Sequence, residues 1–228
     1  MTAHDAKVPQ PDGSRKGAVR AAGAGSAWDA PMALLLIAYC SVWLTHLSST
    51  SLSPPTDNIE QLNWVHSLEW GYYKHPPFPT WLFWPLVRLF GANAWTSYAA
   101  AAIANLASMA ILWTLLYRLR GQAFARLALL STLCITYYSL RFHAYNHNTV
   151  LMLISTGCAA LCWQAHVTGQ LRWWIALGVL LGLGALTKYQ IAVTVTCVVA
   201  FWLTQRGWRD PQMRRGLLLS ALTALVVF

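Results

Sequence analysis

The sequence has very little charge, and acidic residues are especially scarce. Of 228 residues, 10% are charged and 57% are hydrophobic, whereas soluble domains carry about 25% charged residues. Only seven residues are acidic, and none lies between Glu69 and Asp210. So few charges could not solvate the surface of a soluble protein over that length. The composition therefore excludes a soluble domain and predicts a polytopic membrane protein.

Cysteine pairs with the Cys-x-x-Cys spacing are also absent. The five cysteines all fall inside or at the edges of apolar segments, where they are expected to pack as small apolar residues. No disulfide framework is indicated. The net charge of +9 comes from basic residues at the ends of apolar runs. Nucleic acid is therefore not a predicted partner.

The apolar runs predict an all-α, polytopic transmembrane helical bundle. Residues 1–27 are polar and predict a disordered cytoplasmic tail, and residues 28–228 form the transmembrane domain. A span needs about 20 mostly apolar residues. The predicted spans lie near residues 31–47, 95–117, 124–140, 149–166, 173–186 and 191–203. The last apolar run, 216–228, is too short to cross, so the chain is expected to be the N-terminal portion of a longer protein.

The orientation follows from the distribution of lysine and arginine. Residues 78–90 contain Pro85 and Arg88 and are predicted to lie at the interface without crossing. With the N-terminus inside, the inner segments then carry 12 of the 16 basic residues and the outer segments carry four. The outer basic residues are Lys74, Arg88, Arg141 and Lys188. This arrangement places residues 48–94, 139–148 and 187–190 outside.

The first outer loop, 48–94, holds the three acidic residues nearest to the membrane. After Pro54-Pro55, the spacing of Asp57 and Glu60 fits a capping box at the start of a short helix. This helix is expected to be amphipathic and to lie on the membrane, with Asp57, Glu60 and Trp64 on its exposed face. A purely structural role for both carboxylates as helix caps remains an alternative.

The second half of this loop is aromatic and ends in His75-Pro76-Pro77. Tryptophan and tyrosine favour membrane interfaces, so anchoring alone explains the aromatic side chains. His75 is a candidate acid/base group, although an ordinary interfacial histidine is the alternative.

Several of these residues match a known pattern. Asp57-Asn58, Trp64 and Tyr72-Tyr73-x-His75-Pro76-Pro77 resemble the first outer loop of glycosyltransferase family 39. This family, in the GT-C superfamily, includes protein O-mannosyltransferases and lipid A aminoarabinose transferases. Residues 141–150 and the segment Gly182-Leu-Gly-Ala-Leu-Thr-Lys188-Tyr189 also resemble it. The similarity covers roughly residues 30–205.

The sequence departs from the family pattern inside the outer loop. Asn58 stands where the family usually has glutamate, and Lys74 stands where it often has aspartate. The tyrosine pair that usually follows the acids is replaced by Glu60-Gln61. These changes leave open which residue takes the second acidic role.

The resemblance implies a GT-C-like fold and transfer of a sugar from a polyprenyl-phosphate donor to a lipid, glycan or protein hydroxyl. Asp57 would be the general base and Glu60 the second catalytic acid. The scheme requires neither a metal nor another cofactor. The donor phosphate would be bound by Lys188, Arg141 and Lys74. The substrate pocket would include Asn58, Trp64, Tyr73, His75 and Tyr189.

Two other functions remain open, a transporter or flippase of lipid-linked intermediates and a non-catalytic assembly subunit. A transporter usually has ionisable residues at mid-bilayer, whereas here the acids gather in one outer loop. Lys188 could also merely extend to the interface. The expected location is the bacterial inner membrane, with the N-terminus cytoplasmic and the active-site loop periplasmic.

Overall fold

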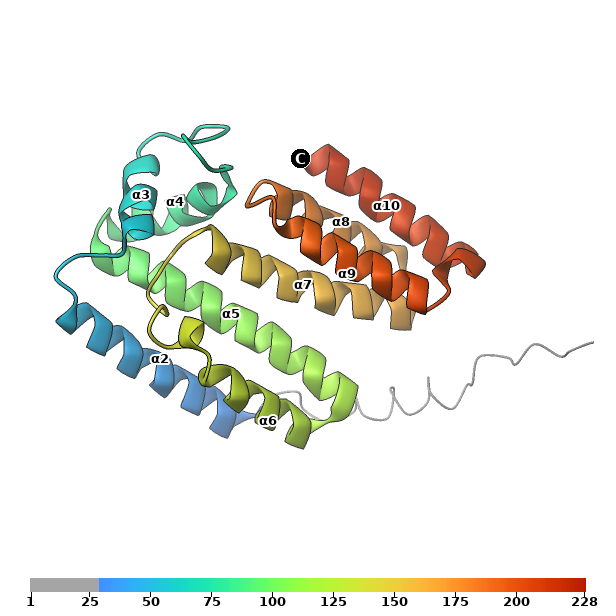
Figure 1. The fold of residues 1–228 in the computed structure, drawn as a ribbon, viewed down its shortest axis with the longest axis horizontal. Helices are drawn as coiled ribbons and strands as arrows, with labels where there is room; N and C mark the ends of the chain where they lie inside the picture. Colours follow the sequence, from blue (N-terminus) through green and yellow to red (C-terminus); the bar gives the residue numbers. More distant parts are fainter. Residues whose placement is uncertain (1–28) are drawn as a thin grey trace, which may run out of the picture.

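The computed structural model describes residues 29–228, in which every regular element is a helix (Figure 1). The tail predicted for residues 1–27 lies outside the described residues. The elements are α2 (Ala30–Thr50), α3 (Thr56–Trp64), α4 (Phe78–Phe90), α5 (Ala94–Arg120), α6 (Gln122–Leu133), η1 (Thr136–Tyr138), α7 (His147–Thr168), α8 (Leu171–Ala185), α9 (Ile191–Thr204), η2 (Gly207–Arg209) and α10 (Pro211–Val227).

Three helices, α2, α5 and α7, are long and apolar enough to cross a membrane. The helices α8 and α9 are apolar but shorter, with 15 and 14 residues. The short helices α3 and α4 lie at one end of the bundle, between α2 and α5 in the sequence (Figure 1). The predicted fold class, an all-α membrane bundle with juxtamembrane helices in the first loop, is confirmed.

The predicted span over residues 124–140 is wrong in its extent. The helix α6 has 12 residues, which is about 18 Å of helix, and ends at Leu133. The Tyr39 hydroxyl donates to the Leu133 carbonyl at 3.0 Å. Beyond the short turn η1, residues 142–147 are all buried. The Asn58 and Asn105 side chains donate to backbone carbonyls of this segment, so its buried polar groups are satisfied without a helix.

The described loops meet at two opposite ends of the bundle. At one end, residues 55–80, 139–148 and 186–190 come together, and the Phe78 N–H donates to the Leu186 carbonyl at 3.0 Å. At the other end, the Arg118 guanidinium donates to Gln164 at 2.8 Å, and Gln212 contacts Gly169. The three segments predicted to share the outer side therefore do share one end.

Glycines allow close packing between α8 and α10. A Cβ atom at Gly178 would lie 2.5 Å from the Ser220 carbonyl oxygen, and one at Gly182 would lie 2.7 Å from the Val227 Cβ. The Ser220 hydroxyl also donates to the Trp174 carbonyl at 2.6 Å. Small residues and interhelical hydrogen bonds drive helix association in membranes. The glycine pair is thus a packing feature.

Candidate functional site

Asp57 lies in the first turn of α3, at the end of the bundle where the three loops meet. The N-cap is Pro55, and no side chain caps the helix, so the predicted capping box does not form. Instead, the Asp57 Oδ2 atom accepts a hydrogen bond from Asn146 Nδ2 at 2.8 Å. Asp57 therefore links α3 to the start of α7 and does not act as a helix cap.

Asn58 is fully buried and supports the irregular segment before α7. Its Nδ2 donates to the His143 carbonyl and to Ser97 Oγ, both at 2.9 Å, and its Oδ1 accepts the Tyr145 N–H at 2.9 Å. An ionised glutamate could not donate either bond. The departure from the family pattern at this position therefore has a structural explanation. The structure places Asn58 behind Asp57, away from accessible surface.

Asn58→Asp is expected to lower stability. A carboxylate at this buried position would face the His143 carbonyl with no proton to donate, and an unsatisfied buried polar group costs about 1–3 kcal/mol, or more when charged. The measurement is the apparent Tm of purified protein in detergent. Asn63→Asp, at an exposed position of the same helix, is the matched control. Equal Tm values for the two variants would contradict this role for Asn58.

Lys188 comes to the same end from the α8–α9 turn. Its Nζ donates to Asn148 Oδ1 at 2.7 Å, two residues beyond the Asn146 that binds Asp57. Among residues 29–228, the ion pairs are Lys74–Glu60 and Arg126–Asp29, so Lys188 has no carboxylate within 4.0 Å in this part of the chain. One turn of α7 thus contacts both a carboxylate and an ammonium group that is not ion-paired.

Glu60 and Lys74 pair with each other. Their N···O distance is 2.6 Å, and both side chains are partly exposed. The hydrogen bond to Glu60 raises the pKa of Lys74 above its usual value, although burial opposes the shift. In this structure the predicted second acid therefore neutralises one of the predicted phosphate ligands.

An aromatic cluster joins the outer loop to the start of α7. The Trp64 ring stacks on Tyr72 with centroids 5.1 Å apart, and it packs edge-on against His75 and His147. The two imidazole rings stack on each other at 3.9 Å. Burial and then the positive charge of Lys74 hold the pKa of His75 below its usual 6.5. His75 therefore resists protonation more than a free imidazole does.

Stability is expected to fall as the pH is lowered below about 6.5. The unfolded chain binds a proton at His75 near that pH, whereas the folded chain resists it, so this contribution is present above pH 6.5 and lost below it. The pKa of this imidazole is also affected by four nearby charges, those of Lys74, Lys188, Glu60 and Asp57. The measurement is the apparent Tm between pH 7.5 and pH 5.

His75→Gln is expected to reduce this pH dependence, and His66→Gln, at an exposed position of the same loop, is the control. An unchanged pH dependence in His75→Gln would contradict the assignment.

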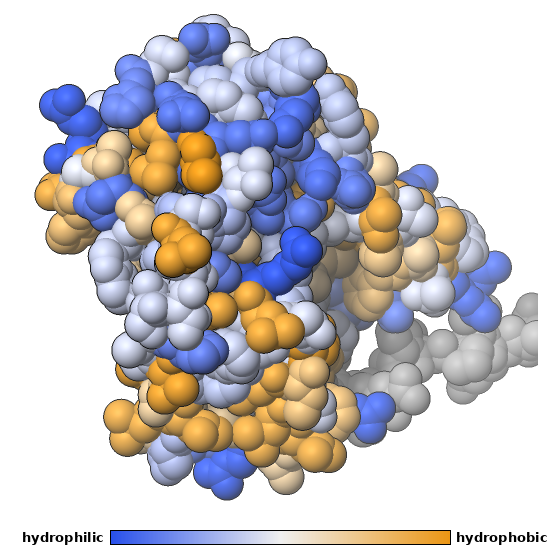
Figure 2. Space-filling model, turned by 60° about the vertical axis from the view of Figure 1, so that its left-hand side comes forward, coloured by the Kyte–Doolittle hydropathy of each residue, from blue (hydrophilic) through white to orange (hydrophobic). Residues whose placement is uncertain are grey.

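The remaining predicted site residues are more exposed. Arg141 is exposed. Its charge lowers the pKa of Tyr137, whereas the charge of Asp57 raises it. Tyr73 and Tyr189 are 97% and 81% exposed, so neither is part of a formed pocket here. Figure 2 brings this end of the molecule forward and shows hydrophilic side chains concentrated in the upper half of the face, with apolar ones below.

Sequence reasoning placed residues 139–148 on the same side as Asp57 and Lys188, but it gave no catalytic role to the three polar residues at the start of α7. Asn146 is the N-cap, and it is followed by His147 and Asn148. The available signal was an asparagine directly before a long apolar run, which is typical of a helix start. That signal locates the helix, but it gives no indication that Asp57 and Lys188 would bind there.

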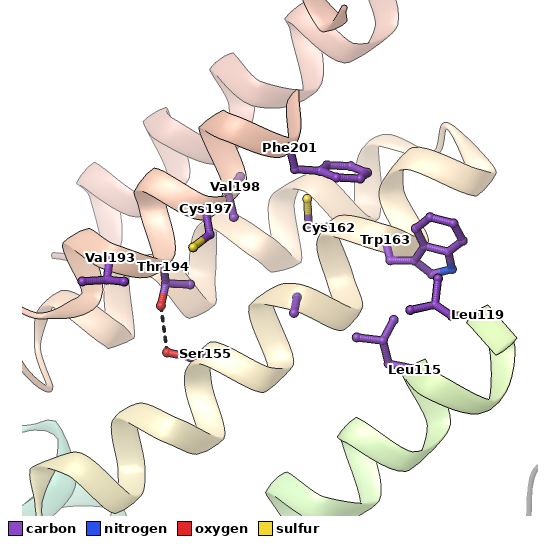
Figure 3. A pocket seen from close by; sticks show the side chains of 11 residues that line it. Leu115, Leu119, Ser155, Cys162, Trp163, Val193, Thr194, Cys197, Val198 and Phe201 are labelled. Carbon is purple, nitrogen blue, oxygen red and sulfur yellow. Dashed lines mark hydrogen bonds between the residues drawn. The ribbon is translucent and has the colours of Figure 1, made fainter. Parts of the chain in front are cut away.

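A second feature, an apolar groove, lies away from these residues. It has a volume of about 380 Å³ and runs between α5, α7 and α9 (Figure 3). Leu115, Trp163 and Phe201 line it, and its polar contact is the 2.8 Å hydrogen bond between Ser155 and Thr194. Neither Asp57 nor Lys188 borders the groove, which offers no acid, base or cation for catalysis.

Comparison with known proteins supplies the family. The family described as dolichyl-phosphate-mannose-protein mannosyltransferase matches residues 74–228, which is more than half of the chain. The chain belongs to this mannosyltransferase family. It is therefore an integral membrane protein and a membrane glycosyltransferase of the GT-C type, as the outer-loop resemblance predicted.

The mannosyltransferase match includes Lys74, His75, Arg141 and Lys188, and it begins after Asp57 and Glu60. The roles of those two carboxylates therefore rest on geometry and on the sequence resemblance. No curated protein and no solved structure matches the chain.

Proposed function

We propose that the protein transfers a sugar from a polyprenyl-phosphate donor to an acceptor hydroxyl at the outer face of the bacterial inner membrane. Asp57 takes the proton of the acceptor hydroxyl, and the acceptor oxygen attacks the anomeric carbon with inversion. The bond from that carbon to the phosphate oxygen breaks, and polyprenyl phosphate leaves. The proton stays on Asp57 until solvent removes it.

The observation that carries the proposal is the arrangement around the first turn of α7. Asp57 contacts Asn146, and Lys188 contacts Asn148. A base and a cation must lie on either side of one reacting carbon for an in-line displacement. Charges placed in advance are worth most where charge develops in the transition state, and the leaving phosphate is the group that gains negative charge here.

The other predicted residues have supporting roles in this proposal. Arg141 is exposed and is available as a second cation for the donor phosphate. Glu60 and Lys74 form an ion pair that holds the middle of the outer loop against α3. The exposed aromatic rings of Tyr73 and Tyr189 offer flat apolar surfaces to an acceptor sugar or lipid headgroup.

A donor panel tests the proposal. Membranes with and without the full-length protein are incubated with radiolabelled mannose or aminoarabinose carried on polyprenyl phosphate, or with the matching nucleotide sugar. Protein-dependent transfer is expected with the lipid-linked donors and not with the nucleotide sugar. Transfer from the nucleotide sugar would contradict the donor class. Movement of labelled lipid across the membrane without transfer would favour the flippase alternative, and no activity would favour the assembly subunit.

A further inference from the structure

The buried side chain of Asn146 uses both ends of its amide group. It is 4% exposed, and its Oδ1 accepts the backbone N–H groups of Asn148 at 2.9 Å and Thr149 at 3.0 Å. Because those partners only donate, the carbonyl end of the amide must face them. The NH₂ end is therefore directed away from α7, and it donates to Asp57 Oδ2 at 2.8 Å.

A neighbouring contact fixes the same register between α3 and the segment before α7. Asn58, next to Asp57, accepts the N–H of Tyr145, which is next to Asn146. Two consecutive residues of α3 thus bind two consecutive residues of this segment. Asp57 Oδ1 accepts no hydrogen bond from residues 29–228, so one carboxylate oxygen is held and the other is left to receive a proton.

We infer that Asn146 is a positioning residue for the proposed base, and this inference rests on the proposed function. Its N–H donation to Oδ2 fixes the carboxylate plane so that Oδ1 faces the reacting hydroxyl. The capping bonds to α7 hold Asn146 in place, so the orientation of Asp57 is set before substrate binds. Asp57 is the proposed base and Asn146 is the helix cap, and one hydrogen bond joins them.

The test uses Asn146→Asp and Asn146→Ser in the full-length protein. Aspartate and serine both remain good helix caps, but an ionised aspartate has no proton to donate, and the serine hydroxyl ends one bond short of the amide nitrogen that binds Asp57. With polyprenyl-phosphate mannose as donor, kcat is expected to fall about 10- to 100-fold, as for a small misplacement of a reacting group, with KM nearly unchanged. In Asn146→Asp the acidic limb of the pH–rate profile should move to higher pH, because a second carboxyl group makes loss of the proton harder.

Asn93→Asp is the matched control. Asn93 caps α5 by accepting the Thr96 N–H at 3.0 Å, and its amide donates to carbonyl groups of its own loop without contacting an acid. This variant is expected to keep the wild-type pH–rate profile. Wild-type kcat and pH dependence in both Asn146 variants would overturn the inference.

A stability measurement separates this inference from the proposed function. Asn146→Asp should lower the apparent Tm at pH 8, because two carboxylates then face each other. Adding Asp57→Asn should recover it, because the amide introduced on α3 can donate to the carboxylate introduced at the α7 cap. If the decreases in Tm of the two single variants simply added in the double variant, the two side chains would not interact. That result would overturn the inference whatever transfer activity is measured. Wild-type transfer by Asp57→Asn alone would refute the proposed function, and the positioning role with it.

Discussion

Asp57→Asn is expected to reduce sugar transfer by about 10²–10⁴-fold, which is the usual contribution of a general base. The amide cannot accept the proton of the acceptor hydroxyl. Its carbonyl oxygen can still accept the hydrogen bond from Asn146 Nδ2 that the carboxylate accepts in the wild type. The measurement is the initial rate of transfer from polyprenyl-phosphate mannose at matched expression.

A structural role for Asp57 predicts a different outcome. If the residue only tied α3 to α7, asparagine would replace it with little loss, and both the Tm and the rate would stay near those of the wild type. Glu69→Gln is the control, because Glu69 is an exposed acid of the same loop whose carboxylate binds Ser67 at 2.9 Å. Equal rates for the two variants would show that Asp57 is not the base.

Lys188→Met is expected to reduce kcat/KM for the donor by about 10²–10³-fold, the scale found when one group that stabilises developing negative charge is removed. Methionine keeps the length and the apolar stem but loses the charge. The loss should appear with any acceptor, because the proposed partner of Lys188 is the donor phosphate. The measurement is the dependence of rate on donor concentration at saturating acceptor.

Lys74→Met is the matched control, since that ammonium group is already paired with Glu60. Its effect on kcat/KM for the donor should be smaller than that of Lys188→Met. Lys188→Arg should retain part of the activity, because the charge is kept while the geometry changes. If Lys188 served only to reach the membrane interface, Lys188→Met would transfer at the wild-type rate.

Hydrophobic runs located most of the helices. The predicted spans near 31–47, 95–117 and 149–166 correspond to α2, α5 and α7, and the interfacial segment 78–90 coincides with α4. These segments are long or sharply bounded by proline and glycine, so composition is sufficient to locate them. The predicted span 124–140 is too long because its helix ends at Leu133 and a short 3-10 turn follows at Thr136–Tyr138, with Ile135 and Leu140 exposed.

The sequence placed Asp57, Lys188 and residues 139–148 on one side, but the individual contacts among them were beyond sequence reasoning. The irregular backbone at residues 142–145 is held by the amides of Asn58 and Asn105, which lie 85 and 37 residues away in the sequence. The pattern of the outer loop predicted an exposed face with Asp57 and Glu60, but it did not predict that Asn58 and Gln61 form the buried face of α3. A polar side chain is buried where it finds a hydrogen-bond partner, and those partners are known only once the helices have packed.

The most direct test of the central claim is a stoichiometry measured with the full-length protein in lipid nanodiscs. Polyprenyl-phosphate mannose, labelled in both the sugar and the lipid, is incubated with an acceptor identified in the membrane assay. One polyprenyl phosphate is expected to be released for each mannose transferred, with the anomeric configuration inverted in the product. Release of lipid phosphate without a glycosylated product, or a product with retained configuration, would contradict direct attack by an acceptor activated at Asp57.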